Sequence, residues 1–111
     1  MHRVSVAVGD TVYKEGDQGS EAFLVLAGEL ALNRQEITLT AEAGAVIGLS
    51  ALINKPYGAT ARARVRSDLL AFTRRELRGM IRSDPDRALV IIDAIIDLLG
   101  QLNTAMDGSN M

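Results

Sequence analysis

The sequence is poorest in the residues that carry most enzymatic and metal chemistry. Its 111 residues include no cysteine, no tryptophan and a single histidine, His2, beside the initiator methionine. Disulfides, thiolate nucleophiles, zinc fingers, iron–sulfur clusters and Ser-His-Asp triads all need residues that are missing here. A cupin-like centre, which holds a metal with several histidines and a carboxylate, is excluded for the same reason. We therefore expect no enzymatic activity and no bound metal or cofactor.

Long apolar runs and a charged-then-apolar leader are also missing. The unbroken apolar runs are far shorter than the roughly 18 residues that a membrane helix needs. With 48% apolar and 23% charged residues, the chain can nevertheless bury a core, and its length fits a single domain over residues 1–111. We expect a cytoplasmic protein with no membrane insertion.

The charges are unevenly distributed, although the net charge is only −2. The segment 62–87 holds eight arginines against four acidic residues, whereas the segments on either side of it are acidic. A basic band can meet nucleic acid, an acidic partner or the chain's own acidic parts, or it can be a solvated face. Because no aromatic or recognition helix accompanies the charge, we expect a solvated face. Any DNA binding by this chain alone should be non-specific.

Residues 3–72 have the pattern of short strands separated by glycine turns. Apolar residues alternate with polar ones at 37–42 and 59–66, and the continuous apolar run 22–27 ends at Gly28. In 59–66 the alanines and Val65 should face inward and the arginines outward. The polar segment 33–36 is short enough for a hairpin loop. These patterns predict a mainly β fold.

Two helices should follow the strands, at about 74–82 and 85–106. Thr73-Arg74-Arg75-Glu76 has the form of a capping box, and Ser83-Asp84-Pro85 is a second helix start. The longer helix carries two apolar stripes, and one is enough to dock on a small domain. We expect the other stripe, through Ile92, Ile96 and Leu99, to form a homodimer. The alternative is a helix buried on both sides within its own domain.

The turn residues resemble those of a known family. Lys14-Glu15-Gly16-Asp17, Glu21 and the segment 23–30 are similar to the K-E-G-D…F-x-(I/V)-L-x-G-x-V signature of cyclic-nucleotide-binding domains, both catabolite-activator-like and protein-kinase-A-regulatory-like. Residues 44–53 and 56–63 resemble the two parts of the family's phosphate-binding cassette. The resemblance covers most of residues 8–100. It implies a double-stranded β-helix, the jelly roll or β-roll of this family, with C-terminal helices.

The resemblance also places a ligand pocket in the cassette, where Gly48 would let the backbone approach the ligand. The corresponding residues here are Gly48, Leu49, Ser50, Ala51, Leu52, Tyr57, Gly58, Ala59 and Thr60. Two charged side chains of the family's site are missing, because its glutamate aligns with Leu49 and its arginine with Tyr57. A charge-assisted hydrogen bond contributes about 1.5–3 kcal/mol, so we expect cyclic nucleotide binding to be weaker by about two to four orders of magnitude.

Three interpretations of the function follow. The first is a non-enzymatic regulatory or interaction domain that no longer recognises cAMP or cGMP in the usual way. It would bind a protein partner or a less anionic, nucleotide-like ligand instead. The second is a working sensor in which Tyr57 stacks on the base and backbone amides hold the phosphate. The third is the effector domain of a longer transcription regulator, because many bacterial members carry a helix-turn-helix after the long helix and these 111 residues do not. We favour the first.

Overall fold

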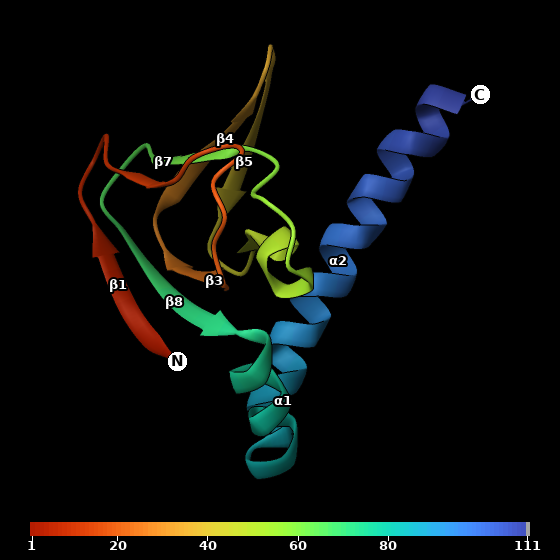
Figure 1. The fold of residues 1–111 in the computed structure, drawn as a ribbon. Helices are drawn as coiled ribbons and strands as arrows, with labels where there is room; N and C mark the ends of the chain where they lie inside the picture. Colours follow the sequence, from red (N-terminus) through yellow and green to blue (C-terminus); the bar gives the residue numbers. More distant parts are fainter. Residues whose placement is uncertain (111) are drawn as a thin grey trace.

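A computed structural model describes the backbone of residues 1–110 and the side chains of residues 1–98. The strands are β1 (His2–Val6), β2 (Thr11–Tyr13), β3 (Glu21–Ala27), β4 (Glu29–Arg34), β5 (Ile37–Glu42), β6 (Val46–Ile47), β7 (Thr60–Ala63) and β8 (Ser67–Thr73). They form two antiparallel four-stranded sheets, with the orders β1-β8-β3-β6 and β2-β7-β4-β5 (Figure 1). The predicted mainly β fold with C-terminal helices is confirmed.

The strand β3 contributes to two apolar cores. Its Phe23 and Val25 point into the core between the two sheets. The alternate residues, Ala22 and Leu24, lie on the outer face of the first sheet, where the helices cover them. Successive side chains of a strand point to opposite faces, so a strand buried on both faces is apolar throughout. This explains the continuous run 22–27.

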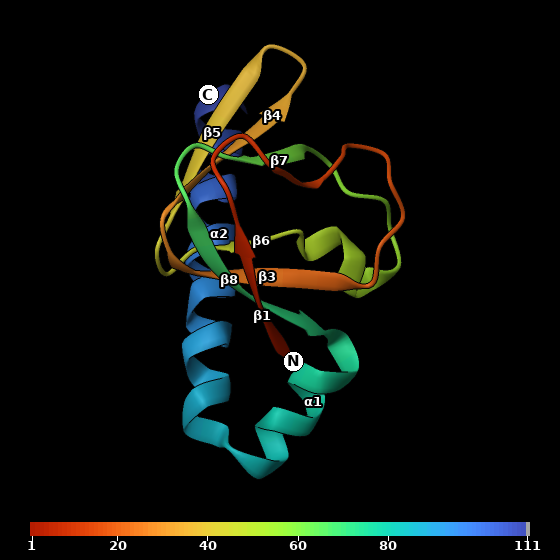
Figure 2. The same cartoon turned by 90° about the vertical axis from the view of Figure 1, so that its left-hand side faces the viewer.

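Three helices follow or interrupt the strands. A short 3₁₀ helix, η1 (Leu49–Ile53), connects β6 to β7, and α1 (Arg74–Ser83) and α2 (Pro85–Asn110) come after β8. The capping box is confirmed: the Thr73 hydroxyl accepts from the Glu76 amide at 3.1 Å, and the Glu76 carboxylate accepts from the Thr73 amide at 3.0 Å. The helix α2 runs along the side of the roll (Figure 2) and extends beyond the predicted end near residue 106.

The helices cover the outer face of the first sheet. From α2, Ala88, Ile91 and Ala94 pack into the outer core, and α1 adds Met80.

Within the part of the chain that the structure describes, neither helix is long and apolar enough to cross a bilayer.

The β4–β5 hairpin differs from its prediction in two ways. The loop is shorter than 33–36, because β4 continues to Arg34, which pairs with Ile37, and only Gln35 and Glu36 lie between the strands. The hairpin also projects beyond the rest of the roll (Figure 1), so that Ile37 and Leu39 are 64% and 54% exposed. Alternation predicted a buried face here, but β5 is an edge strand and only its base reaches the core.

The strand β7 follows its predicted alternation, except at its end. Ala61 and Ala63 are buried and Arg62 and Arg64 are exposed. Val65 is exposed rather than buried, because β7 ends at Ala63 and the inward alternation ends with it. All eight arginines of the segment 62–87 are exposed.

Candidate ligand pocket in the roll

The cassette begins at a glycine with a left-handed backbone. Gly48 has φ 76° and ψ 25° and directly precedes η1. A residue with a β-carbon rarely adopts this conformation, and here it would also meet two rings. An added β-carbon would lie 3.1 Å from the Tyr57 ring and 3.3 Å from the Tyr13 ring. Gly48 therefore allows two aromatic side chains to lie against the backbone.

The Tyr57 ring fills the space beside Gly48. It stacks on Tyr13 with ring centroids 4.0 Å apart and an interplanar angle of 15°. Tyr13 in turn stacks on Phe23, at 6.0 Å and 19°. Three of the chain's four aromatic rings thus form one row inside the roll. Tyr57 and Tyr13 are only 7% and 8% exposed.

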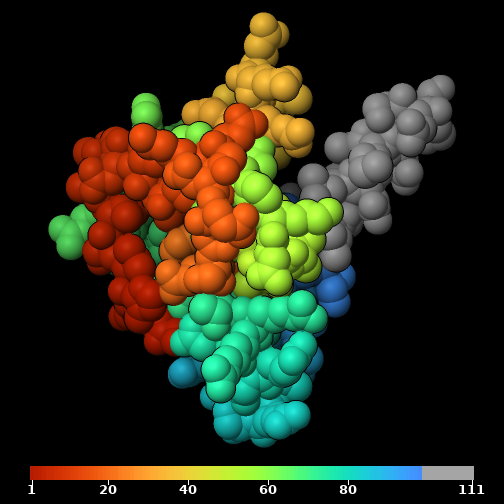
Figure 3. Space-filling model, in the orientation of Figure 1, coloured from red at the N-terminus to blue at the C-terminus, as the bar shows by residue number. Residues whose placement is uncertain are grey.

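Hydrogen bonds hold Tyr57 in this position. Its hydroxyl donates to the Glu21 carbonyl at 2.7 Å. Its amide donates to the Asp17 carbonyl at 3.0 Å, and its carbonyl accepts from the Gly16 amide at 2.8 Å. An added β-carbon at Gly19 would overlap the ring, so this glycine is also part of the ring's surroundings. The loop 14–20 is therefore attached to the cassette, and the two segments lie against each other in Figure 3.

Both tyrosines are held in their neutral form. Burial raises the pKa of Tyr13, and the proximity of Tyr57 raises it further. Burial also raises the pKa of Tyr57, and the negative charge of the Glu21 carboxylate raises it further. The hydrogen bond to the Glu21 backbone lowers this pKa, but its effect is smaller. Neither ring can supply a charge to a phosphate.

The amides of η1 are partly engaged within the turn itself. The Ala51 amide donates to the Gly48 carbonyl at 3.2 Å, and the Ala51 side chain belongs to the core between the sheets. The Ser50 carbonyl accepts from the Lys55 amide at 3.0 Å. Ser50 is half-buried.

The remaining cassette residues lead into and begin β7. Ala59 and Thr60 are half-buried and Gly58 is exposed. The Thr60 hydroxyl accepts from the Glu15 amide at 3.0 Å, so it helps to attach the loop 14–20 to β7.

The structure does not bring the predicted pocket residues together at one place. It brings Gly48, Ala51 and Tyr57 together in the interior of the roll. Leu49 and Leu52 instead pack against the outer core beneath α1 and α2. Leu49 and Tyr57, at which the resemblance led us to expect the family's two charged side chains to be missing, therefore face different surroundings.

No basic side chain lies inside the roll. All twelve lysines and arginines are within residues 1–98, and all are exposed, including Lys55 and Arg62 on either side of Tyr57. Among the residues with described side chains, no three His, Cys, Asp or Glu converge as metal ligands would. The interior of the roll is lined mainly by apolar and aromatic side chains, with Ser67 as its buried polar residue.

Tyr13 and Gly19 complete this site, although no motif in the sequence places them in the cassette. Tyr13 is one of only two tyrosines and directly precedes Lys14-Glu15-Gly16-Asp17. A rare aromatic residue beside a turn motif is a signal that could have drawn attention to it.

The predicted dimer stripe on α2 is only partly exposed. Ile92 is half-buried and Ile96 is 58% exposed, while the Leu99 side chain lies outside the described residues. Leu89 and Val90 add further exposed apolar surface to the same helix.

Comparison with known proteins agrees with this fold. A family model described as "Cyclic nucleotide-binding domain" matches residues 3–84. The N-terminal domain of a transcriptional regulator from Streptomyces coelicolor A3(2) is 28% identical, with a TM-score of 0.67, over 95% of this chain and 78% of that chain. The catabolite activator protein of Thermus thermophilus is 26% identical, with a TM-score of 0.78, over 98% and 55% of the two chains.

A third structure and the curated proteins complete the comparison. A cyclic nucleotide-binding domain from Methylobacillus flagellatus has a TM-score of 0.74 at 21% identity, over 95% of this chain and 64% of that chain. Among curated proteins, none matches the chain. The predicted β-roll of the cyclic-nucleotide-binding type is confirmed.

Proposed function

Since the chain belongs to the cyclic nucleotide-binding domain family, we propose that it is a non-enzymatic regulatory or interaction domain that does not bind cAMP or cGMP in the usual way. The observation that supports this function is the Tyr57 ring, which occupies the space beside Gly48 and is stacked on Tyr13. A nucleotide would have to displace a buried ring before it could reach the backbone there.

The electrostatics of the interior support the same proposal. A cyclic phosphate carries a negative charge, and burying an unpaired charge is costly. All lysines and arginines of the chain are exposed, so no cation is in place to pair with that charge. Displacing Tyr57 would also break an aromatic stack worth about 0.5–1.5 kcal/mol. We expect dissociation constants in the millimolar range or weaker.

Isothermal titration with cAMP and cGMP tests the proposal. The wild-type chain should give no saturable heat, and a dissociation constant below about 10 μM would contradict the proposal. Tyr57→Ala removes the ring without adding charge, whereas Tyr57→Arg removes it and adds a cation. Affinity should increase in the order wild type, Tyr57→Ala, Tyr57→Arg.

A matched control separates added charge from the opened pocket. Ile53→Arg adds the same cation to η1 at an exposed position and leaves the Tyr57 ring in place. It should bind nucleotide no better than the wild type. If Tyr57→Arg binds no more tightly than Ile53→Arg, then the ring does not close the site.

The alternative within the same pocket is a sensor in which Tyr57 stacks on the nucleotide base. It would need the Tyr57 ring to leave Tyr13 and the hydroxyl to give up its bond to Glu21. A ligand that binds the folded state raises the melting temperature. A rise with millimolar cAMP or cGMP in the wild type would favour the sensor, and no rise would exclude it.

The likeness to the Streptomyces coelicolor domain supports a wider role. That protein is described as the N-terminal domain of a transcriptional regulator. We propose that this chain has the role of an effector domain in such a regulator. The reading frame after codon 111 tests this role: a helix-turn-helix sequence there would support it, and an immediate stop codon would exclude it.

We also propose a homodimer through α2. The helix buries Ile91 and Ala94 against the sheet and leaves Ile96 in solvent, where an unpaired apolar stripe favours association. Sedimentation should give about twice the chain mass, and Ile96→Asp should give the monomer mass. Ile81→Asp, at an exposed position of α1, is the matched control and should stay dimeric. A monomeric wild type at about 100 μM would refute the dimer.

A further inference from the structure

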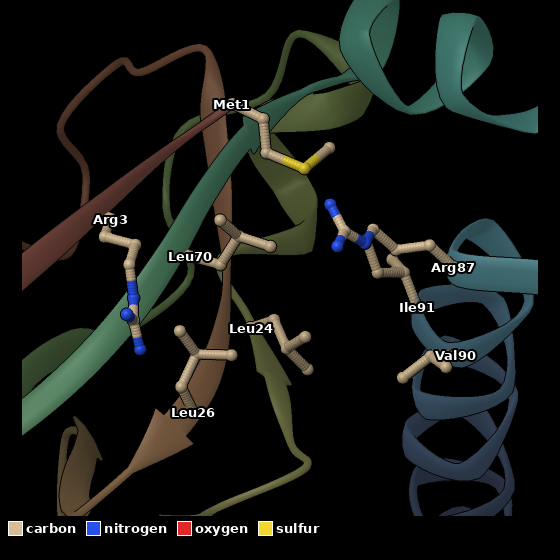
Figure 4. A pocket seen from close by; sticks show the side chains of 8 residues that line it. All are labelled: Met1, Arg3, Leu24, Leu26, Leu70, Arg87, Val90 and Ile91. Atoms are coloured by element: carbon tan, nitrogen blue, oxygen red, sulfur yellow. The ribbon is translucent and has the colours of Figure 1, made fainter. Parts of the chain in front are cut away.

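A cavity of about 460 Å³ lies on the other side of the first sheet from Tyr57. It is formed between the outer face of that sheet and the first turns of α2. The sheet contributes Leu24, Leu26 and Leu70, and α2 contributes Val90 and Ile91 (Figure 4). Its volume lies in the range of about 300–1,000 Å³ that is typical of small-molecule sites.

The floor of this cavity is apolar and aliphatic. Ile91 is 1% exposed and Leu24 is 7% exposed, whereas Leu26 and Leu70 are half-buried and Val90 is largely exposed. The Met1 side chain closes one end (Figure 4). No aromatic ring is among the described lining residues, so the walls fit a flexible aliphatic chain better than a flat ring system.

The described lining also includes two arginines, and it includes no acidic side chain. Arg87 extends from α2 toward Met1, and Arg3 extends from β1 on the far side of Leu26 and Leu70 (Figure 4). Among the residues with described side chains, the Arg87 guanidinium has one ionic partner, the Asp84 carboxylate at 3.7 Å, and both side chains of this pair are largely exposed. Such pairs are weak, so an incoming carboxylate can replace Asp84. The Met1 amino group is paired with Glu76.

We propose that this cavity binds a medium-chain aliphatic monocarboxylate, with the alkyl chain on Leu24, Leu70 and Ile91 and the carboxylate on Arg87. A guanidinium binds a planar carboxylate through two parallel hydrogen bonds, and the alkyl chain buries apolar surface that is otherwise partly hydrated. This site is separated from the Tyr57 pocket by the sheet, so the proposal is independent of whether the roll interior binds a nucleotide.

Titration of the full chain with decanoate and with 1-decanol tests the proposal. Decanoate should bind at one site per chain with a dissociation constant on the order of 100 μM, about fivefold more tightly than the uncharged alcohol. Arg87→Gln should weaken decanoate binding about fivefold and leave decanol binding unchanged. Arg82→Gln removes an exposed arginine of α1 that does not line the cavity, and it should change neither. Equal affinities for acid and alcohol would overturn the proposal.

A second pair of variants tests the apolar wall without disturbing the core. Val90→Glu places a negative charge on the exposed wall of the cavity, whereas Val8→Glu makes the same change at an exposed turn position remote from it. Val90→Glu should abolish decanoate binding and Val8→Glu should not. Sedimentation of Val90→Glu should match the wild type, so that a change of assembly is excluded as the cause. Unchanged decanoate binding by Val90→Glu would place the ligand elsewhere and refute the site.

Discussion

Replacement of Tyr57 by alanine should be one of the most destabilising single changes in the roll. Removing a buried aromatic ring costs about 3–5 kcal/mol, because the burial is lost and a cavity remains. The change also leaves the Glu21 carbonyl without its 2.7 Å hydrogen bond, which adds about 1 kcal/mol. The whole stability of a small domain is about 5–15 kcal/mol. We expect a loss of about 5 kcal/mol and a fall in melting temperature of roughly 20 °C.

Further variants separate the contributions of the hydroxyl and of the stack, and one of them serves as a control. Tyr57→Phe keeps the stack on Tyr13 and removes only the hydroxyl, so it should cost about 1 kcal/mol. Ile53→Ala, at an exposed position of the neighbouring turn, should change stability by less than about 0.5 kcal/mol. A double-mutant cycle of Tyr13→Ala with Tyr57→Ala should give a coupling of about 0.5–1.5 kcal/mol from the stack.

Urea denaturation followed by far-ultraviolet circular dichroism is the appropriate assay, because the chain has no tryptophan to report by fluorescence. An unfolding free energy for Tyr57→Ala within about 1 kcal/mol of the wild type would refute the reasoning, because a tightly packed ring cannot be removed at so small a cost. It would mean that the Tyr57 ring is outside the roll in solution, and the interior would then be open to a ligand.

Three other predictions concern the folded state. Burial raises the folded-state pKa values of Tyr13 and Tyr57 above 10.0. The contribution of these two groups to stability should therefore be constant below about pH 10 and should be lost above it, where the unfolded chain loses protons that the folded chain retains. Tyrosinate absorbance reports on these two residues alone and should rise at a higher pH in the folded chain than in the urea-unfolded chain. Gly28→Ala should prevent folding or lower the free energy of unfolding by several kcal/mol. The φ of Gly28 is 99°, and a β-carbon there would overlap the buried Ser67 side chain. Resistance to urea close to that of the wild type would contradict this prediction. Thr73→Ala breaks the capping box and should lower the free energy of unfolding by about 1 kcal/mol in the same assay. An unchanged free energy of unfolding would show that the cap is not formed in solution.

The sequence predicted most features that depend on neighbouring residues. The capping box at Thr73 and Glu76 and the alternation of β7 are of this kind. Their signals lie within a few residues of the structure that they specify, so they can be read directly from the chain. The exposure of Ile37 and Leu39 could not be read in this way, because alternation indicates a common face but does not say whether another sheet covers that face.

The sequence by itself determined the β-roll, its turns, its helices and the absence of charged side chains at positions 49 and 57. Only the tertiary structure decided what surrounds these two positions. Tyr57 meets Tyr13 and Gly19 because the loop 14–20 is hydrogen-bonded to the segment that follows η1, and these contacts join parts of the chain that are far apart in sequence. The direction of Leu49, away from Tyr57 and toward the helices, is likewise set by the path of η1 between two cores. Packing of this kind depends on the whole fold, because each side chain occupies only the space that its distant neighbours leave free.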